Sequence, residues 1–485
     1  MNRRFLETSL IYGAVQWAGP FVTLVLTPIL TRILDPSDYG VSDFVMTVAA
    51  GIGTIALFGL PQALTAHFND RPGDPEWRRS ITGSALALSA AIGLTLALVL
   101  MTFARPIAQW AWHDTRHAFL FQIAAGTLLF SAINSVMTRA AQAALQSRWV
   151  IAIGLTSVVA TAVGNVGLIV ILRLGVAGMV LVPAAAGIAL TAAIAILMRP
   201  MVGRMHWGTT RLLFRSGTIL LPAAAAAWIL QAADRLFLVH IVSTQELGYY
   251  AIANRIAALI HVLVAPVATA WTALALAAQH DPGERARSAD GARHLISLAL
   301  FGALALGLFA REILAVFTRL PYLPAAPYVG FLAYVHVITA VGTVLSATAM
   351  MRKQLGVISW SVIGGAAVNM LLNYLLIPSY GLWGATIATV VGFAAQPVLL
   401  YIALRRGERV EYPMRKLLVA SVVQLGLLVA GMAVAPMPAA PRIAVKLGLL
   451  ASLVAAFAVL DLITPLELAQ TRLFFRRQLR SGRAG

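Results

Sequence analysis

The stretch LTPILTRILDPSDYGVSDFV, residues 26–45, places a short acidic turn between two apolar runs. The first run reaches Arg32, whose long side chain can extend to a polar interface. Pro36 and Gly40 are expected to break the helix at the turn, because proline lacks a backbone N–H and glycine tolerates turn conformations. An apolar segment that stops in a short turn and starts again at once is typical of two membrane-spanning helices joined by an outer loop.

The composition of the whole chain also indicates a membrane protein. Of the 485 residues, 60% are hydrophobic and only 11% are charged, whereas soluble domains carry about 25% charged residues. Apolar stretches of the roughly 20 residues that cross a bilayer recur about fourteen times. They lie near 8–33, 40–66, 80–104, 118–144, 150–172, 176–198, 214–241, 247–278, 293–317, 326–350, 356–376, 382–404, 416–435 and 443–462. The sequence therefore predicts an all-α polytopic membrane protein.

The basic residues are spread over the short segments between these runs. The net charge of +18 in one patch would suggest a nucleic-acid partner, but the dispersed pattern excludes that class. With the amino terminus inside, 25 of the 36 Lys and Arg are cytoplasmic, 8 are outside and 3 fall within spans. The positive-inside rule then places both termini in the cytoplasm. No cleavage motif follows Arg3 and Arg4, so we expect an uncleaved first helix. The chain has no cysteine and hence no disulfide.

Two weak internal matches indicate a duplicated architecture. DYGVSDF (38–44) resembles ELGYYAI (246–252), which pairs Gly40 with Gly248 at an offset of 208. Segments 150–179 and 357–386 also match, and they pair two glycines at an offset of 206 (Gly175 with Gly381, Gly178 with Gly384). Six helices per half give both halves one orientation, as in transporters built from parallel repeats. The predicted parts are an N-lobe at 1–205, a C-lobe at 206–410, two extra helices at 411–465 and a basic cytoplasmic tail at 466–485.

Ionisable side chains inside spans are rare and costly, so each one is a candidate for a site. Asp43 lies near the outer end of its span, and two further spans carry Gln231, Asp234, Arg235, Tyr250, Asn254, Arg255 and His261. Asp234 and Arg235 are sequence neighbours and point about 100° apart on a helix. We therefore expect them not to pair directly, and each to need another partner.

Arginine suits the binding of a phosphate head group, because guanidinium stays charged when buried and donates paired hydrogen bonds to phosphate oxygens. Arg235 and Arg255, at similar depth, are the leading candidates, with Asn254 and Gln231 beside them. Arg32 would receive the head group at the outer mouth.

The acidic residues are candidates for holding these arginines or for coupling. Asp234 and Asp43 would pair with the arginines between cycles, or take up the H⁺ or Na⁺ that drives transport, and His261 would relay a proton. A plainer interpretation is that the charges only fasten helices together. Arg139 lies near the inner end of its span. Its side chain either extends to the polar interface or makes a further contact with the substrate.

Three motifs together carry a resemblance to a known family: LTPILTRILDPSDYG, FGLPQALTAHF (58–68) and GLWGA (381–385). The chain resembles the polysaccharide transporter family, the Wzx-type flippases of lipid-linked oligosaccharides such as O-antigen units. Its superfamily also holds multidrug and toxic compound extrusion (MATE) antiporters and the lipid II flippase. That family usually has Gly where Asp35 stands, and the arginine-rich segment and Asp-Ala-Phe turn of the lipid II branch are absent.

The resemblance implies a MATE-like fold with two lobes around a central cavity. It implies an undecaprenyl-diphosphate-linked glycan as substrate, moved across the bacterial cytoplasmic (inner) membrane by alternating access. Membrane lipids and a polysaccharide polymerase are candidate partners, and a monomer is expected. No cofactor or metal is expected beyond a coupling H⁺ or Na⁺.

Three other functions are compatible with a polytopic membrane protein. A cation-coupled drug antiporter would favour an acidic cavity, whereas the buried set has three arginines and few acids. A lipid II flippase on the same fold is a further alternative. A membrane-embedded glycan polymerase or glycosyltransferase would need a large outer loop with catalytic carboxylates. The chain shows no such loop and no nucleotide-binding motif, so we expect no enzymatic activity.

Overall fold

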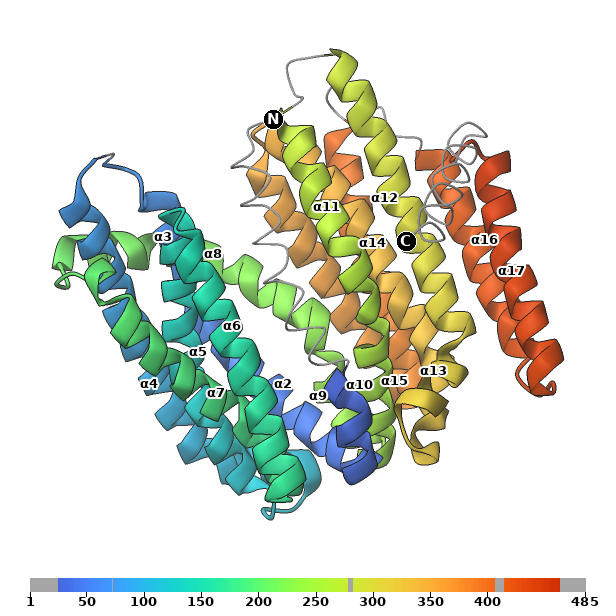
Figure 1. Cartoon of the computed structure of the whole chain (residues 1–485), viewed down its shortest axis with the longest axis horizontal. Helices are drawn as coiled ribbons and strands as arrows, with labels where there is room; N and C mark the ends of the chain where they lie inside the picture. Colours follow the sequence, from blue (N-terminus) through green and yellow to red (C-terminus); the bar gives the residue numbers. More distant parts are fainter. Residues whose placement is uncertain (1–24, 72, 278–281, 406–413, 463–485) are drawn as a thin grey trace, which may run out of the picture. The chain divides into compact units, whose positions relative to one another are not determined.

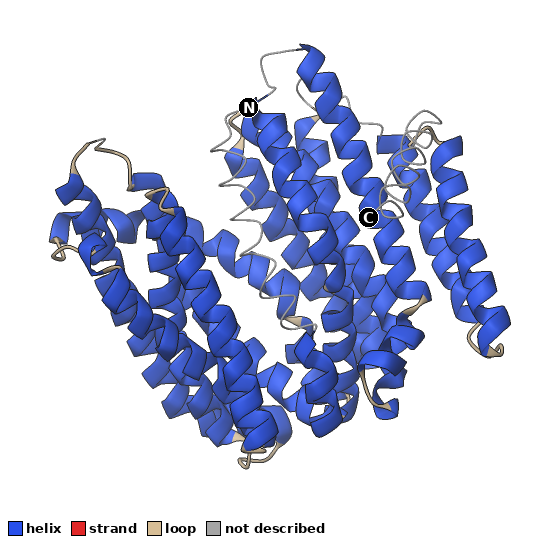
Figure 2. Cartoon of the chain, in the orientation of Figure 1, coloured by secondary structure: helices blue, strands red, loops and turns tan. Residues whose placement is uncertain are grey.

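The computed structural model describes residues 25–71, 73–277, 282–405 and 414–462. Within these ranges the chain forms helices and connecting loops and no strand (Figure 2). Twelve helical segments of the described residues are long and apolar enough to cross a membrane. The predicted all-α membrane fold is therefore confirmed. The predicted first span lies mostly outside the described residues, and the predicted tail at 466–485 lies entirely outside them.

The chain divides into two compact units (Figure 1). The first comprises residues 1–252, 314–325 and 362–392, and the second comprises 253–313, 326–361 and 393–485. The predicted boundaries of the lobes stay a prediction.

In chain order, the helices between residues 36 and 257 are α2 (Pro36–Leu57), α3 (Leu60–His67), α4 (Pro75–Trp112), α5 (Ala118–Ala143), α6 (Ser147–Gly164), the π-helical η1 (Asn165–Ile171), α7 (Gly175–Leu197), η2 (Arg199–Met201), α8 (Trp207–Ala232), α9 (Asp234–Ile241) and α10 (Thr244–Ala257). They are followed by α11 (Leu259–Ala277), α12 (Pro282–Leu308), α13 (Ala310–Phe317), η4 (Leu320–Ala325), α14 (Ala326–Met351), α15 (Leu355–Leu404), α16 (Met414–Ala433) and α17 (Ala439–Val459).

Four predicted continuous spans are each interrupted, which corrects the prediction. The span at 40–66 consists of α2 and α3, the span at 214–241 of α8 and α9, the span at 247–278 of α10 and α11, and the span at 293–317 of α12 and α13. The first break occurs at Phe58 and Gly59, which both adopt left-handed φ angles of 48° and 64°. A Cβ on Gly59 would lie 2.9 Å from the Cβ of Leu220 on α8, so close packing adds to the demand for glycine.

Helix α15 runs for 50 residues and combines two predicted spans. At 1.5 Å per residue a straight helix of this length would extend for about 75 Å, more than twice a bilayer core. Gly381 interrupts it with φ 52° and ψ −124°. The predicted spans at 356–376 and 382–404 therefore lie on either side of this kink, and each of them is long enough to cross the membrane once.

The opening turn differs from its prediction in one respect. Asp35 caps α2, and Pro36 is the first residue of the helix, where its missing N–H costs nothing. Gly40 lies inside α2 and does not break it. Its Cβ would lie 2.0 Å from the carbonyl oxygen of Thr244 on α10. Glycine at position 40 is thus explained by a helix contact.

The contact between α2 and α10 joins residues that the repeat pairs. A Cβ on Gly248 would lie 1.7 Å from the carbonyl oxygen of Pro36, just as one on Gly40 would strike Thr244. The hydroxyls of Ser37 and Thr244 lie 2.7 Å apart and share a hydrogen bond. The two helix starts therefore pack backbone against backbone.

The second pair of repeat-related glycines also has matching geometry. Gly175 and Gly381 adopt left-handed φ angles of 55° and 52°. Three residues later, a Cβ on Gly178 would lie 3.2 Å from the carbonyl oxygen of Leu168, and one on Gly384 would lie 2.4 Å from that of Leu376. Both halves use the first glycine to reverse the chain and the second for close approach.

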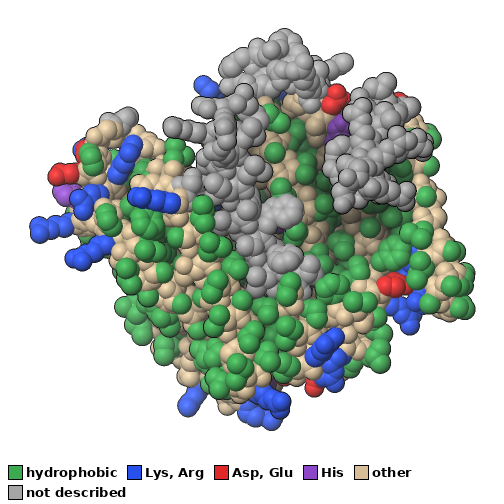
Figure 3. Space-filling model, in the orientation of Figure 1, with side chains coloured by type: hydrophobic (Ala, Val, Ile, Leu, Met, Phe, Trp, Pro, Cys, Tyr) green, Lys and Arg blue, Asp and Glu red, His purple; other side chains and the backbone are tan. Residues whose placement is uncertain are grey.

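The surface fits a membrane environment. On the face in view, hydrophobic side chains cover much of the helices, and Lys and Arg gather in groups toward helix ends (Figure 3). Exposed large apolar side chains include Val163 (65% exposed) on α6 and Ile196 (78%) on α7. Such exposure is expected where lipid tails, and not water, surround the helices.

Gln424 on α16 offers a test of packing in the second unit. It is fully buried, and neither Nε2 nor Oε1 has a hydrogen-bond partner among the described residues. Replacing it with methionine, Gln424→Met, is expected to raise the free energy of unfolding by about 1–3 kcal/mol, because the cost of burying an unpaired amide disappears. Chemical unfolding in detergent measures this, with Leu428→Met on the same helix as the control. A loss of stability in Gln424→Met would contradict the prediction.

An ion-pair cluster fastens α17 to α13 in the second unit. The carboxylate of Glu312 accepts hydrogen bonds from Lys446 Nζ at 2.7 Å and from Arg442 Nε at 3.0 Å. Lys446 is buried, with only 4% of its side chain exposed. Burial by itself raises the pKa of Glu312, but the hydrogen bonds from Lys446 and Arg442 outweigh it and hold this pKa below its ordinary value.

The lowered pKa of Glu312 makes stability depend on pH. The ionised carboxylate contributes stability above the ordinary glutamate pKa of 4.5, and the contribution is lost as the pH falls through the lower folded-state pKa. Because Glu312 remains partly exposed, we expect about 1 kcal/mol or less. Unfolding of the native chain and of Glu312→Gln between pH 7 and 3 tests this. The difference in stability should shrink below about pH 4, and a constant difference would argue against the cluster.

Candidate functional site

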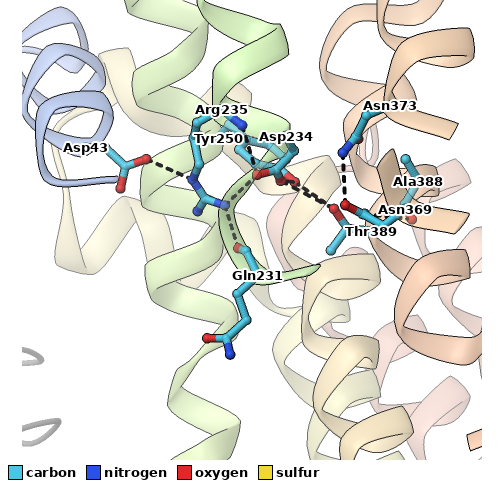
Figure 4. Close-up of polar contacts among 9 residues, drawn as sticks. All are labelled: Asp43, Gln231, Asp234, Arg235, Tyr250, Asn369, Asn373, Ala388 and Thr389. Carbon is cyan, nitrogen blue, oxygen red and sulfur yellow. Dashed lines mark hydrogen bonds and ion pairs between the residues drawn. The ribbon is translucent and has the colours of Figure 1, made fainter. Parts of the chain in front are cut away.

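Arg235 is the centre of a buried polar network in the first unit (Figure 4). Its Nε donates to Asp43 Oδ2 at 3.1 Å, and its Nη1 donates to Asp234 Oδ1 at 2.9 Å. Only 10% of the Arg235 side chain and 3% of the Asp234 side chain are exposed, whereas Asp43 is 30% exposed. The guanidinium carbon also lies 5.3 Å from the ring centroid of Tyr250. The arginine is thus held between α2, α9 and α10.

The direct Asp234–Arg235 pair corrects the expectation that these neighbours would not pair. The helix breaks at Ala233, and Asp234 begins α9. The backbone N–H of Arg235 donates to Asp234 Oδ1 at 2.9 Å, so it does not use the carbonyl of Gln231 one turn earlier. That carbonyl instead accepts from Arg235 Nη1 at 3.1 Å. The break therefore frees a backbone acceptor and lets the long arginine side chain fold back onto both groups.

The other oxygen of Asp234 is bound by two hydroxyls. Tyr250 on α10 donates to Oδ2 at 2.5 Å, and Thr389 on α15 donates to the same atom at 3.3 Å. Tyr250 is completely buried and Thr389 is 6% exposed. Asp234 thus connects three helices through one carboxylate, and all its partners lie within the first unit.

Two asparagines continue the polar path along α15. Asn373 Nδ2 donates to Asn369 Oδ1 at 3.0 Å, and Asn369 Nδ2 donates to the carbonyl of Ala388 at 3.1 Å, next to Thr389 (Figure 4). Asn373 Oδ1 is buried and has no hydrogen-bond partner among the described residues.

The charges of this network do not cancel. Asp43 and Asp234 carry two negative charges when ionised, and Arg235 carries one positive charge. Asp43 is 30% exposed, so water compensates part of its charge.

The remaining candidate residues lie elsewhere. The side chain of Gln231 is exposed and points away from Arg235, and only its carbonyl contributes (Figure 4). Arg32 is exposed, and its carbonyl accepts from Arg319 at 3.4 Å. Arg139 is exposed and donates to Gln142 at 3.2 Å. Their roles in substrate binding stay predictions.

Three further candidates belong to the second unit. Asn254 and Arg255 are half-buried near the end of α10. His261 lies beyond the break at Ala258, on α11. It is exposed, and its ring centroid lies 5.8 Å from that of His336. Their roles also stay predictions.

Thr389, Asn369 and Asn373 were not predicted. A threonine in an apolar helix is common, so Thr389 has no sequence signal of its own. The two asparagines, four residues apart in an apolar span, do carry one, because that spacing puts both amides on one helix face.

Comparison with solved structures identifies the fold. The chain is similar to the lipid II flippase MurJ in an inward closed conformation, with a TM-score of 0.70, 13% identity, and coverage of 94% of this chain and 100% of that one. It is also similar to an inward-facing MATE-family multidrug resistance transporter of the MOP superfamily (TM-score 0.58, 15% identity, coverage 83% and 96%). A Vibrio cholerae MATE transporter gives 0.55, 14% identity, and coverage of 83% and 98%. The fold is therefore that of membrane flippases and transporters.

Comparison at the level of sequence gives the family. The sequence matches no curated protein. Residues 29–318, more than half of the chain, match the model of a family described as polysaccharide biosynthesis protein. The suspected relationship is confirmed, and this multi-pass membrane protein belongs to the polysaccharide biosynthesis protein family.

Proposed function

We propose that the protein moves an undecaprenyl-diphosphate-linked oligosaccharide across the bacterial cytoplasmic membrane by alternating access. The observation that carries the proposal is the family match over residues 29–318 on a flippase and transporter fold. A polysaccharide biosynthesis protein with the fold of flippases and transporters is suited to deliver lipid-linked sugars across the membrane, and the sequence shows no nucleotide-binding motif. The proposed function is transport, not catalysis.

The network around Arg235 supports a cation-coupled cycle. In the structure, Asp43 and Asp234 hold the guanidinium. Uptake of H⁺ or Na⁺ at Asp234 would neutralise the carboxylate and weaken its hold on Arg235. The guanidinium would then be free to donate to a diphosphate, for which its paired donors are suited. Release of the cation would restore the Asp234–Arg235 pair and expel the head group.

A cation-coupled drug antiporter is the second candidate. The net negative charge of Asp43, Asp234 and Arg235 favours it, because a cationic drug would be attracted to the surplus carboxylate. Lipid II remains a third candidate substrate on the same fold. These candidates differ in what crosses the membrane, so one assay with several substrates separates them.

The test is translocation between leaflets in proteoliposomes. The substrates are a lipid-diphosphate-linked oligosaccharide, lipid II and a cationic dye, each under imposed Na⁺ and proton gradients. Arg235→Ala and Arg255→Ala are compared with Arg211→Ala, an exposed arginine on α8. Size-exclusion profiles and thermal unfolding show whether each variant is folded.

The expected result is movement of the oligosaccharide by the native chain and by Arg211→Ala, with at least a tenfold loss in the other two variants, the size expected when a charged hydrogen bond is lost. Exchange of dye for protons without glycan movement would establish the antiporter instead. Movement of lipid II alone would establish the third candidate. Equal glycan transport in all variants would retain the flippase and reject the arginine site.

A further inference from the structure

The helices α6 and α7 run side by side in the first unit (Figure 1). A small apolar groove lies between them. The groove is lined by Trp149, Ile153 and Thr156 of α6 and by Leu190, Ile194 and Leu197 of α7. Thr156 is the one polar residue of this set. Neighbouring apolar side chains are strongly exposed, including Val159 (57%) and Ile196 (78%). The groove therefore opens onto a surface suited to lipid tails.

Two arginines lie at one end of this groove. Val150 and Met198 pack in the same buried cluster, so the start of α6 adjoins the end of α7. Arg148 and Arg199 flank this point and are both exposed. The guanidinium carbon of Arg148 lies 5.0 Å from the ring centroid of Trp149, which lines the groove. Neither arginine has a carboxylate partner among the described residues.

The charge of the surrounding sequence is strongly one-sided. Residues 115–233 contain eight arginines and not one Asp or Glu. The carboxylates that would neutralise Arg148 and Arg199 are therefore missing from their own helices and from the helices next to them in sequence. A ligand for this end of the groove has to bring the negative charge itself.

We propose that the α6–α7 groove binds an anionic phospholipid of the surrounding membrane. The phosphate lies between the guanidinium groups of Arg148 and Arg199, and one acyl chain lies against the exposed apolar side chains of α6 and α7 that border the groove. Basic pockets between membrane helices bind anionic head groups in this manner. The site is independent of the Arg235 network and of the transported substrate.

Native mass spectrometry of the whole protein in detergent tests the proposal. Phosphatidylglycerol and phosphatidylcholine with identical acyl chains are the two probes, so that only the head-group charge differs. The variants are Arg148→Ala/Arg199→Ala at the proposed mouth and Ala193→Trp, which fills the groove without a change of charge. Arg173→Ala, an exposed arginine in the turn after η1, is the matched control. Thermal unfolding confirms that each variant is folded.

The expected result is tighter binding of phosphatidylglycerol than of phosphatidylcholine by the native chain. The double arginine variant should lower phosphatidylglycerol affinity about 10- to 30-fold, down to the level of phosphatidylcholine. Ala193→Trp should weaken both lipids, and Arg173→Ala neither. Equal binding of the two lipids by the native chain would overturn the proposal. So would an unchanged double variant, or an equal loss in Arg173→Ala, which would indicate unspecific attraction to a basic surface.

Discussion

Replacing Gly248 with alanine is expected to be among the most damaging small substitutions in the chain. The new Cβ would lie 1.7 Å from the carbonyl oxygen of Pro36 and 2.6 Å from its carbonyl carbon. Backbone atoms cannot rotate away as a side chain does, so α2 and α10 must separate and the Ser37–Thr244 hydrogen bond is lost. We expect a loss of about 3 kcal/mol or more, at the upper end of what overpacking costs.

Unfolding in detergent measures the effect, and Gly426→Ala is the matched control. Gly426 lies inside α16, where an added Cβ meets no atom within 4 Å. Alanine there should raise stability by about 0.5–1 kcal/mol, because it restricts the unfolded chain and favours the helix. Gly40→Ala should resemble Gly248→Ala, since its Cβ would lie 2.0 Å from the Thr244 carbonyl oxygen. If Gly248→Ala proved as stable as Gly426→Ala, the close contact would be refuted.

The second large effect is expected at Asp234. Asp234→Ala removes one of two carboxylate partners from the buried Arg235 and leaves the hydroxyls of Tyr250 and Thr389 without their shared acceptor. Removing one partner of a buried ion pair typically costs 3–5 kcal/mol, and we expect about this amount. Transport should be lost as well, because the carboxylate proposed to take up the coupling cation is gone.

A double-mutant cycle separates these contributions. Asp234→Ala/Arg235→Ala should be less destabilised than the sum of its single variants, because neither charge is then left without its partner. Asp43→Ala is the comparison within the network, and it should cost less than Asp234→Ala because Asp43 is 30% exposed and water compensates the lost pair. Strictly additive single effects would show that Asp234 and Arg235 are not coupled.

The membrane fold could be predicted from the sequence because its signal is long and redundant. A run of about twenty apolar residues has few interpretations, and the repeat offsets add independent support. The helix breaks could not be predicted in the same way. Ala233 and Ala258 are helix-favouring residues at positions where the helix stops, and Phe58 carries no turn signal before Gly59. Tertiary contacts decide these breaks.

The site was predicted in part, and for a physical reason. Asp43, Asp234, Arg235 and Tyr250 stand out because polar groups are rare in apolar spans. The direct bond between Asp234 and Arg235 depends on the helix break before Asp234, which the sequence does not reveal. The prediction that these two side chains do not pair was therefore wrong. Thr389 comes from 155 residues away along the chain, and only the folded structure brings it to Asp234.

The contact between α2 and α10 has a consequence for how such a chain could arise. Pro36 meets Gly248, and Thr244 meets Gly40, so each side of the contact offers the same two positions of the repeat to the other. This reciprocity defines the isologous interface of a two-fold symmetric homodimer. A single six-helix chain could therefore have made the same contact with a second copy of itself. Fusion of two such genes would preserve this interface unchanged, with both glycines retained because each one accommodates the other half.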